Sequence, residues 1–149
     1  MQQAALDVIE RDPPRILYIN YGETDEWAHA RRYDRYLEAA RRVDRWLREL
    51  WETLQSIEQY RGTTTLIVTT DHGRGIEAKD WTSHGAEVPR SGEWWIAVMG
   101  PDTRPLGERK NCGSVTQAQT ASTLAAFLGE DFRTAELKAA PPISDVLPK

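Results

Sequence analysis

The chain has 149 residues, of which 40% are hydrophobic and 28% are charged, and this length predicts one domain, or part of one, with enough chain to bury a substantial core. With a formal net charge of −4 and no long basic run, the chain lacks the charge pattern of a nucleic-acid-binding protein. No apolar stretch has the roughly 20 residues that a membrane-spanning helix needs. The single cysteine, Cys112, excludes an internal disulfide framework and a cysteine zinc cluster.

The first part of the chain predicts a helix, a strand and a second helix. Residues 1–12 are typical of the end of a short helix, which a pair of prolines terminates. Arg15–Tyr21 is mostly apolar and predicts a buried strand that ends at Gly22. From about residue 30 to residue 60, apolar side chains recur every three or four positions, so we expect one long amphipathic helix with a charged, solvated outer face.

The next element, Thr63–Gly73, reads Thr-Thr-Thr-Leu-Ile-Val-Thr-Thr-Asp-His-Gly. The apolar and β-branched run predicts a strand buried on both faces, as in a parallel sheet. It stops at Asp71 and His72, because aspartate and glycine disfavour a strand. With the preceding strand and helix it predicts a right-handed parallel crossover, and ligands bind at the carboxyl ends of the strands in such sheets.

The rest of the chain predicts a long functional loop at residues 74–92, a third strand at Glu93–Met99 and a helix at Gln117–Leu128. The predicted fold class is therefore α/β, a mainly parallel sheet flanked by helices, in a single domain over residues 1–149. Three strands would leave unpaired edges, which favours either self-association or pairing with a further part of a longer protein.

The chain's three histidines, His29, His72 and His84, lie at or near the predicted sheet edge, and the first two follow an aspartate at short spacing. Taken singly, each is best interpreted as a hydrogen-bonded loop histidine, but all three lie in such positions. Oxygen and nitrogen ligands without thiolate suit zinc or manganese. Asp25, His29 and His84 would give the three-ligand arrangement of catalytic zinc, with one position open. Asp71 and His72 give only two ligands, so a second ion would need another.

Three motifs in order resemble the C-terminal half of the alkaline phosphatase superfamily: Asp25-Glu-Trp-Ala-His29, Thr69-Thr-Asp-His-Gly73 and Ser83-His-Gly85. This superfamily includes phosphatases, type I phosphodiesterases, sulfatases and cofactor-independent phosphoglycerate mutases. The segment Gln117–Gly129 also resembles its late helix. The resemblance implies an alkaline-phosphatase-like fold, present here as its C-terminal portion, and two divalent metal ions, zinc with manganese as the alternative.

By this resemblance Asp25, His29 and His84 would hold one ion, and Asp71 and His72 the other. The two ions would clamp the attacking and leaving oxygens of an in-line displacement at phosphorus or sulfur. The family also carries an aspartate ligand and a serine or threonine nucleophile (a formylglycine in sulfatases) in an N-terminal half, and nothing before Asp25 matches them. We therefore expect the nucleophile to lie outside this chain, and the chain alone to be inactive.

Three functions remain open at this point. The first is a metal-dependent hydrolase of phosphate or sulfate esters, which the phosphodiesterase-like motif Ser83-His84-Gly85 mildly favours. The second is a phosphomutase of the same superfamily, and the third is a non-catalytic α/β module that binds metal or a partner. The expected partner is a small anionic ester substrate, with no nucleic acid and no membrane.

Other loop residues are weaker candidates. Arg74 and Lys79 could contact an anionic group, although exposed loop cations are usually only solvated, and Trp81 could wall a pocket.

Overall fold

The computed structural model describes residues 1–110 and 112–148, which form two compact units. Unit 1 comprises Met1–Arg61 and His72–Trp94, and unit 2 comprises Gly62–Asp71 and Trp95–Lys149. The prediction of one domain over residues 1–149 stays a prediction. Within the described residues, no helix has the combination of length and apolar character that crossing a membrane requires.

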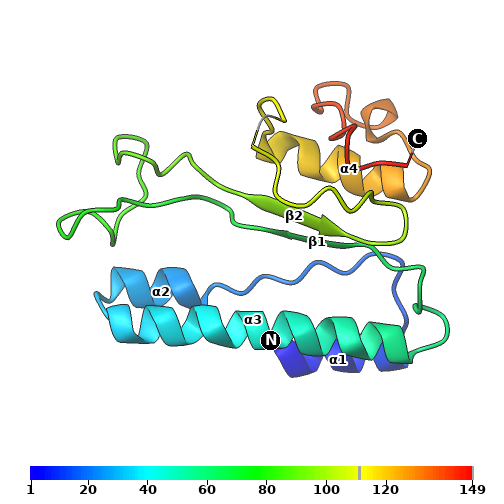
Figure 1. Cartoon of the computed structure of the whole chain (residues 1–149), viewed down its shortest axis with the longest axis horizontal. Coiled ribbons are helices and arrows are strands. Elements are labelled where there is room, and N and C mark those ends of the chain that lie inside the picture. The colour runs from blue at the N-terminus through cyan, green and yellow to red at the C-terminus, as the bar shows by residue number, and fades with distance from the viewer. Residues whose placement is uncertain (111, 149) are drawn as a thin grey trace. The chain divides into compact units, whose positions relative to one another are not determined.

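Unit 1 is built on three helices, α1 (Gln2–Arg11), α2 (Glu23–His29) and α3 (Tyr33–Ser56). Both α1 and α2 lie along α3 (Figure 1). The helices form because apolar residues recur at helical spacing and so gather on one face, which packs against a neighbour. The long helix predicted from about residue 30 to residue 60 is confirmed as α3. The buried apolar side chains of this unit are Ala5, Leu6, Ile9, Ala28, Ala39, Leu50 and Leu54.

A buried glutamine joins α1 to α3 and to the chain that leads into α2. Gln2 Nε2 donates to the Trp46 carbonyl oxygen at 3.2 Å and to the Glu49 carboxylate at 2.8 Å. The Tyr21 hydroxyl donates to Gln2 Oε1 at 2.6 Å, and the Tyr21 ring stacks on Trp46 at 5.3 Å between centroids. Since burying a polar group is favourable only when it is hydrogen-bonded, these bonds fix where the segment before α2 lies.

The segment Arg15–Tyr21 forms no strand, so the prediction of a strand there was wrong. Ile16 is 51% exposed and Tyr18 is 83% exposed. A strand needs a neighbour for its backbone hydrogen bonds, and among the described residues no strand pairs with this segment. The side chains of Ile16 and Tyr18 therefore stay exposed to solvent.

Unit 2 contains two antiparallel strands, β1 (Leu66–Thr69) and β2 (Ile96–Met99), with Leu66 opposite Met99 (Figure 1). Both lie inside runs predicted to be strands. They form the single sheet of the described residues, so the predicted parallel sheet and its crossover are not confirmed. An apolar run predicts a strand but not the direction of its partner, and here the partner runs antiparallel.

The helix predicted at Gln117–Leu128 is present as a 3₁₀ turn, η1 (Gln117–Gln119), followed by α4 (Thr120–Phe127). Two buried hydroxyls of α4 hold the C-terminal segment. Ser122 Oγ donates to the Ala140 carbonyl oxygen at 2.6 Å, and Thr123 Oγ1 accepts the Ile143 backbone N–H at 3.0 Å. A further 3₁₀ turn, η2, spans Phe132–Thr134.

Candidate metal centre

The helix α2 places Asp25 and His29 on one face of unit 1. Residues four apart lie one turn apart on a helix, and Asp25 Oδ2 is 3.3 Å from His29 Nε2. The first turn also carries Glu23 and Glu26, and acidic side chains stabilise a helix N-terminus. No helix was predicted at Glu23–His29, although the Asp25–His29 spacing is the signal that could have indicated it.

Two more histidines reach Asp25 from the segment after residue 71. His72 Nε2 lies 3.8 Å from Asp25 Oδ1, and His84 Nε2 lies 3.6 Å from the same oxygen. His84 Nε2 is also 3.0 Å from His29 Nε2. The rings of His72 and His84 stack at 3.7 Å between centroids. One carboxylate and three imidazoles thus converge within unit 1.

The segment that carries His72 and His84 folds back on itself at two glycines. The Gly73 N–H donates to the Ser91 carbonyl oxygen at 2.8 Å, and the Gly75 N–H donates to the Ser83 carbonyl oxygen at 3.1 Å. Both glycines are approached so closely that a Cβ would overlap backbone atoms of the segment. The close approach brings the two histidines together although eleven residues separate them in the sequence.

Arg74 also belongs to this cluster. Its Nη2 donates to Asp25 Oδ1 at 2.5 Å and its Nη1 donates to the Trp81 carbonyl oxygen at 3.2 Å. Its guanidinium carbon lies 5.7 Å from the centre of the Tyr36 ring, within cation–π range. From the sequence, Arg74 was a candidate for contact with an anionic group or simply a solvated loop cation; its side chain is only 16% exposed, so it is not a solvated cation.

Asp25 is held in its charged form. Burial raises the pKa of its carboxyl group, but the hydrogen bond from Arg74 and the electrostatic interactions with His29, Arg74 and His84 lower it by more, so the net pKa is below its ordinary value. Asp25 is therefore an anion at neutral pH, which is the form that accepts hydrogen bonds or binds a cation.

The geometry of the cluster fits a divalent cation. Zinc binds nitrogen at about 2.0–2.1 Å, so two ligands on a tetrahedron lie about 3.3 Å apart. His29 Nε2 and His84 Nε2 are 3.0 Å apart, and they approach different oxygens of Asp25, Oδ2 at 3.3 Å and Oδ1 at 3.6 Å. Asp25, His72 and His84 offer three ligand atoms within 4.8 Å of one another, so these three residues form the possible ion site. A carboxylate with imidazoles suits zinc or manganese.

The assignment of ligands to two separate ions stays a prediction. The resemblance placed His72 with Asp71 at a second ion, and the structure brings His72 to Asp25 and His84. Asp71 belongs to unit 2 and is described there, where the Gln117 side-chain amide donates to its backbone carbonyl oxygen. Its role as a ligand stays a prediction too.

The two other loop candidates have structural contacts. Lys79 Nζ pairs with Glu77 at 2.9 Å and is 77% exposed, which agrees with a solvated cation. The Trp81 ring packs edge-on against Tyr33 and Tyr36, with centroids 5.4 and 6.1 Å away. Trp81 thus supports the Tyr36 ring over which Arg74 lies.

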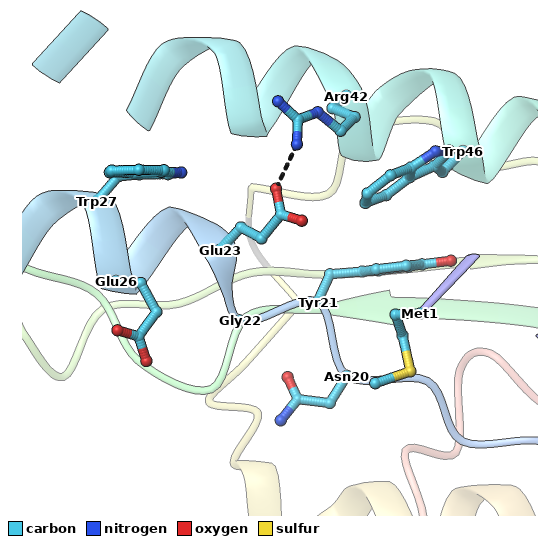
Figure 2. Close-up of a pocket in the computed structure, with 9 residues that line it drawn as sticks. All are labelled: Met1, Asn20, Tyr21, Gly22, Glu23, Glu26, Trp27, Arg42 and Trp46. Atoms are coloured by element: carbon cyan, nitrogen blue, oxygen red, sulfur yellow. Dashed lines mark hydrogen bonds and ion pairs between the residues drawn. The ribbon is translucent and has the colours of Figure 1, made fainter. Parts of the chain in front are cut away.

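Other residues of α2, Glu23, Glu26 and Trp27, border a hollow of about 500 Å³ in unit 1 (Figure 2). Tyr21 and Trp46 stack on one side, and the Glu23 carboxylate points to Arg42, which donates to it at 2.8 Å. None of the predicted site residues lines this hollow. Its lining residues are Met1, Asn20, Tyr21, Gly22, Glu23, Glu26, Trp27, Arg42 and Trp46.

Comparison with known proteins supports a metal centre. The model of the metalloenzyme superfamily matches residues 1–129. A 2,3-bisphosphoglycerate-independent phosphoglycerate mutase from Gracilaria tenuistipitata var. liui is 26% identical over 73 residues, which cover 49% of this chain and 13% of that protein. No solved structure matches the chain. The family match implies an alkaline-phosphatase-like α/β fold and divalent metal binding. The chain therefore belongs to the metalloenzyme superfamily, the alkaline-phosphatase-like group that its motifs resemble.

Proposed function

We propose that this chain supplies the metal-binding part of an enzyme that transfers a phosphoryl group. The observation that carries the proposal is the convergence of Asp25, His29, His72 and His84, with contacts of 3.0–3.8 Å, in a member of the metalloenzyme superfamily. By the resemblance, Asp71 would complete the ligand set contributed by this chain.

Each side chain has a definite part in the proposal. Asp25 is anionic at neutral pH and offers its two oxygens, while His29, His72 and His84 turn their Nε2 atoms towards it. A divalent ion held there would supply the positive charge that stabilises a transferring phosphoryl group. The rings of His72 and His84 stack on each other, so each restrains the orientation of the other.

The similarity to a phosphoglycerate mutase favours transfer of the phosphoryl group within a small anionic phosphate ester. Hydrolysis of phosphate or sulfate esters is the second candidate, and the observation in its favour is the glycine after His84. The matched stretch is 13% of that mutase, so we propose that the nucleophile and the missing metal ligands lie outside this chain. The uncovered segment Arg15–Tyr21 would then pair in a parallel sheet of the longer protein.

The test is phosphoryl transfer by the protein that contains this chain, purified with manganese or zinc. Two products are followed together: the interconverted phosphoglycerate isomers and free inorganic phosphate. We expect isomerisation to exceed phosphate release. Since disturbing even the partners of metal ligands costs about 10- to 100-fold in activity, Asp25→Asn should lower the rate by about 100-fold or more.

The matched control is Asp34→Asn, which makes the same chemical change at an exposed residue that pairs with Arg32. It should leave the rate unchanged. Transfer that is independent of metal, or equal rates in the Asp25 and Asp34 variants, would refute the proposed function. Phosphate release without isomerisation would select the hydrolase instead.

A further inference from the structure

Arg74 is hydrogen-bonded to the carboxylate oxygen of Asp25 that lies nearest to His72 and His84. Asp25 Oδ1 is the oxygen nearest to His72 and His84, at 3.8 and 3.6 Å, and Arg74 Nη2 lies 2.5 Å from this same oxygen. The other oxygen, Oδ2, faces His29 at 3.3 Å. A cation that His72 and His84 held against Oδ1 would therefore share this oxygen with the guanidinium of Arg74.

The guanidinium occupies a built position rather than a chance one. Three groups hold it: the Asp25 carboxylate, the Trp81 carbonyl oxygen at 3.2 Å, and the Tyr36 ring at 5.7 Å. Tyr36 is itself supported by the Trp81 ring. Only 16% of the Arg74 side chain is exposed, so water screens its charge poorly.

A guanidinium keeps its charge at every accessible pH, so it cannot leave Asp25 by losing a proton. A divalent cation on Oδ1 would lie within a few ångströms of that charge, and like charges in a partly buried site repel strongly. The hydrogen bond from Arg74 also uses electron density of Oδ1, which this oxygen would otherwise donate to a bound metal ion.

We propose that Arg74 competes with the divalent cation for Asp25 Oδ1, so that metal binding and release of the guanidinium from Asp25 are one coupled step. This inference rests on the proposed function in that it takes the cluster to be a metal site. Arg74 thereby sets the metal affinity of the site: the chain carries its own cation for Asp25, which an ion must displace.

The test is the affinity for Mn²⁺ alone, measured by isothermal titration calorimetry on the purified chain. Arg74→Gln removes the charge and keeps a side chain that can lie against Tyr36. We expect it to bind Mn²⁺ about tenfold more tightly, since one charge-assisted hydrogen bond no longer opposes the ion. Arg74→Lys keeps the charge and should stay closer to the wild-type affinity.

The matched control is Arg90→Gln, which makes the same change in the same segment at an exposed arginine paired with Glu93 at 2.8 Å. It should leave the affinity within about twofold of wild type, because a surface ion pair contributes little. This control separates the local contact with Asp25 from the general loss of one positive charge.

A second measurement follows Arg74 in the wild-type chain itself. In the wild-type chain, the side-chain Nε–H signal of Arg74, identified by its absence from the Arg74→Lys spectrum, should shift in nitrogen–proton NMR as zinc is added. An unmoved signal at saturating zinc would overturn the inference.

The calorimetric outcomes separate failure of the inference from failure of the proposed function. If wild type and Arg74→Gln both bind Mn²⁺ but the variant binds no more tightly, Arg74 does not compete and the inference alone fails. A weaker variant would mean that Arg74 orients Asp25 for the ion, which also contradicts competition. If neither protein binds Mn²⁺, the metal centre is absent, and the proposed function fails together with the inference.

Discussion

Gly73 follows His72 directly, and replacing it with alanine tests how the candidate metal centre is held. A Cβ at this position would lie 2.5 Å from the Arg90 carbonyl oxygen and closer still to that of Glu93. Real Cβ contacts are essentially never shorter than 3.0 Å, and both oxygens belong to the backbone, so neither can swing away as a side chain would. The segment that carries His72 must therefore move by about half an ångström or more.

The size of the effect follows from three contributions. Overpacking of this kind costs about 1–3 kcal/mol. The movement also weakens the hydrogen bond from the Gly73 N–H to the Ser91 carbonyl oxygen, which is 2.8 Å long and contributes about 1 kcal/mol. Alanine restricts the unfolded chain, which offsets about 0.4–1 kcal/mol. We expect Gly73→Ala to lower the free energy of unfolding by about 2 kcal/mol.

The assay is urea unfolding of the wild-type chain, Gly73→Ala and the matched control Gly92→Ala. Gly92 lies in the same segment, and a Cβ there would meet nothing within 4 Å. The control should be as stable as wild type or more stable by up to about 1 kcal/mol. Equal unfolding free energies for the two variants would refute the close approach at Gly73, and with it the account of how His72 is positioned.

Two further predictions concern other parts of the chain. Thr123→Val should lower the unfolding free energy by about 2 kcal/mol in urea, because the buried hydroxyl donates to the Gln119 carbonyl oxygen and accepts the Ile143 N–H; an unchanged stability would contradict this. The hydrogen bond from Arg32 lowers the pKa of Asp34 from 3.8 to about 2, so carboxyl-carbon NMR should give a midpoint near pH 2 that rises in Arg32→Gln. Because the folded pKa is the lower one, this pair stabilises the fold above about pH 4 and ceases to do so as the pH falls towards 2; a midpoint near 3.8 would contradict the pairing.

The elements that the sequence predicts well are those with a local cause. The helix α3 follows from apolar spacing within its own 24 residues, and β1 and β2 lie inside apolar runs. The direction in which strands pair depends on residues far away in the chain, so the antiparallel sheet could not be predicted from those runs. The segment Arg15–Tyr21 has the pattern of a strand, but no described strand pairs with it.

The sequence predicts the residues of the candidate site but not how the fold brings them together. The sequence singles out Asp25, His29, His72 and His84, and the structure brings them together through α2 and a loop that closes at glycines, not through the parallel strands that were expected. Their role as metal ligands stays a prediction. The contact of Arg74 with Asp25 could not be predicted, because it depends on a ring and a carbonyl group that the fold places around the guanidinium.

Measurement of the metal content decides whether this cluster holds a divalent ion. The purified chain is loaded with zinc or manganese, freed of excess ion and measured by elemental mass spectrometry beside His84→Ala, with Asp34→Asn as the control. We expect about one ion or more per chain in the wild type and the control, and loss of the ion in His84→Ala, which removes the imidazole that contacts His29 and Asp25. A wild-type chain that stays metal-free after loading, or a His84→Ala chain that keeps its full metal content, would contradict this expectation.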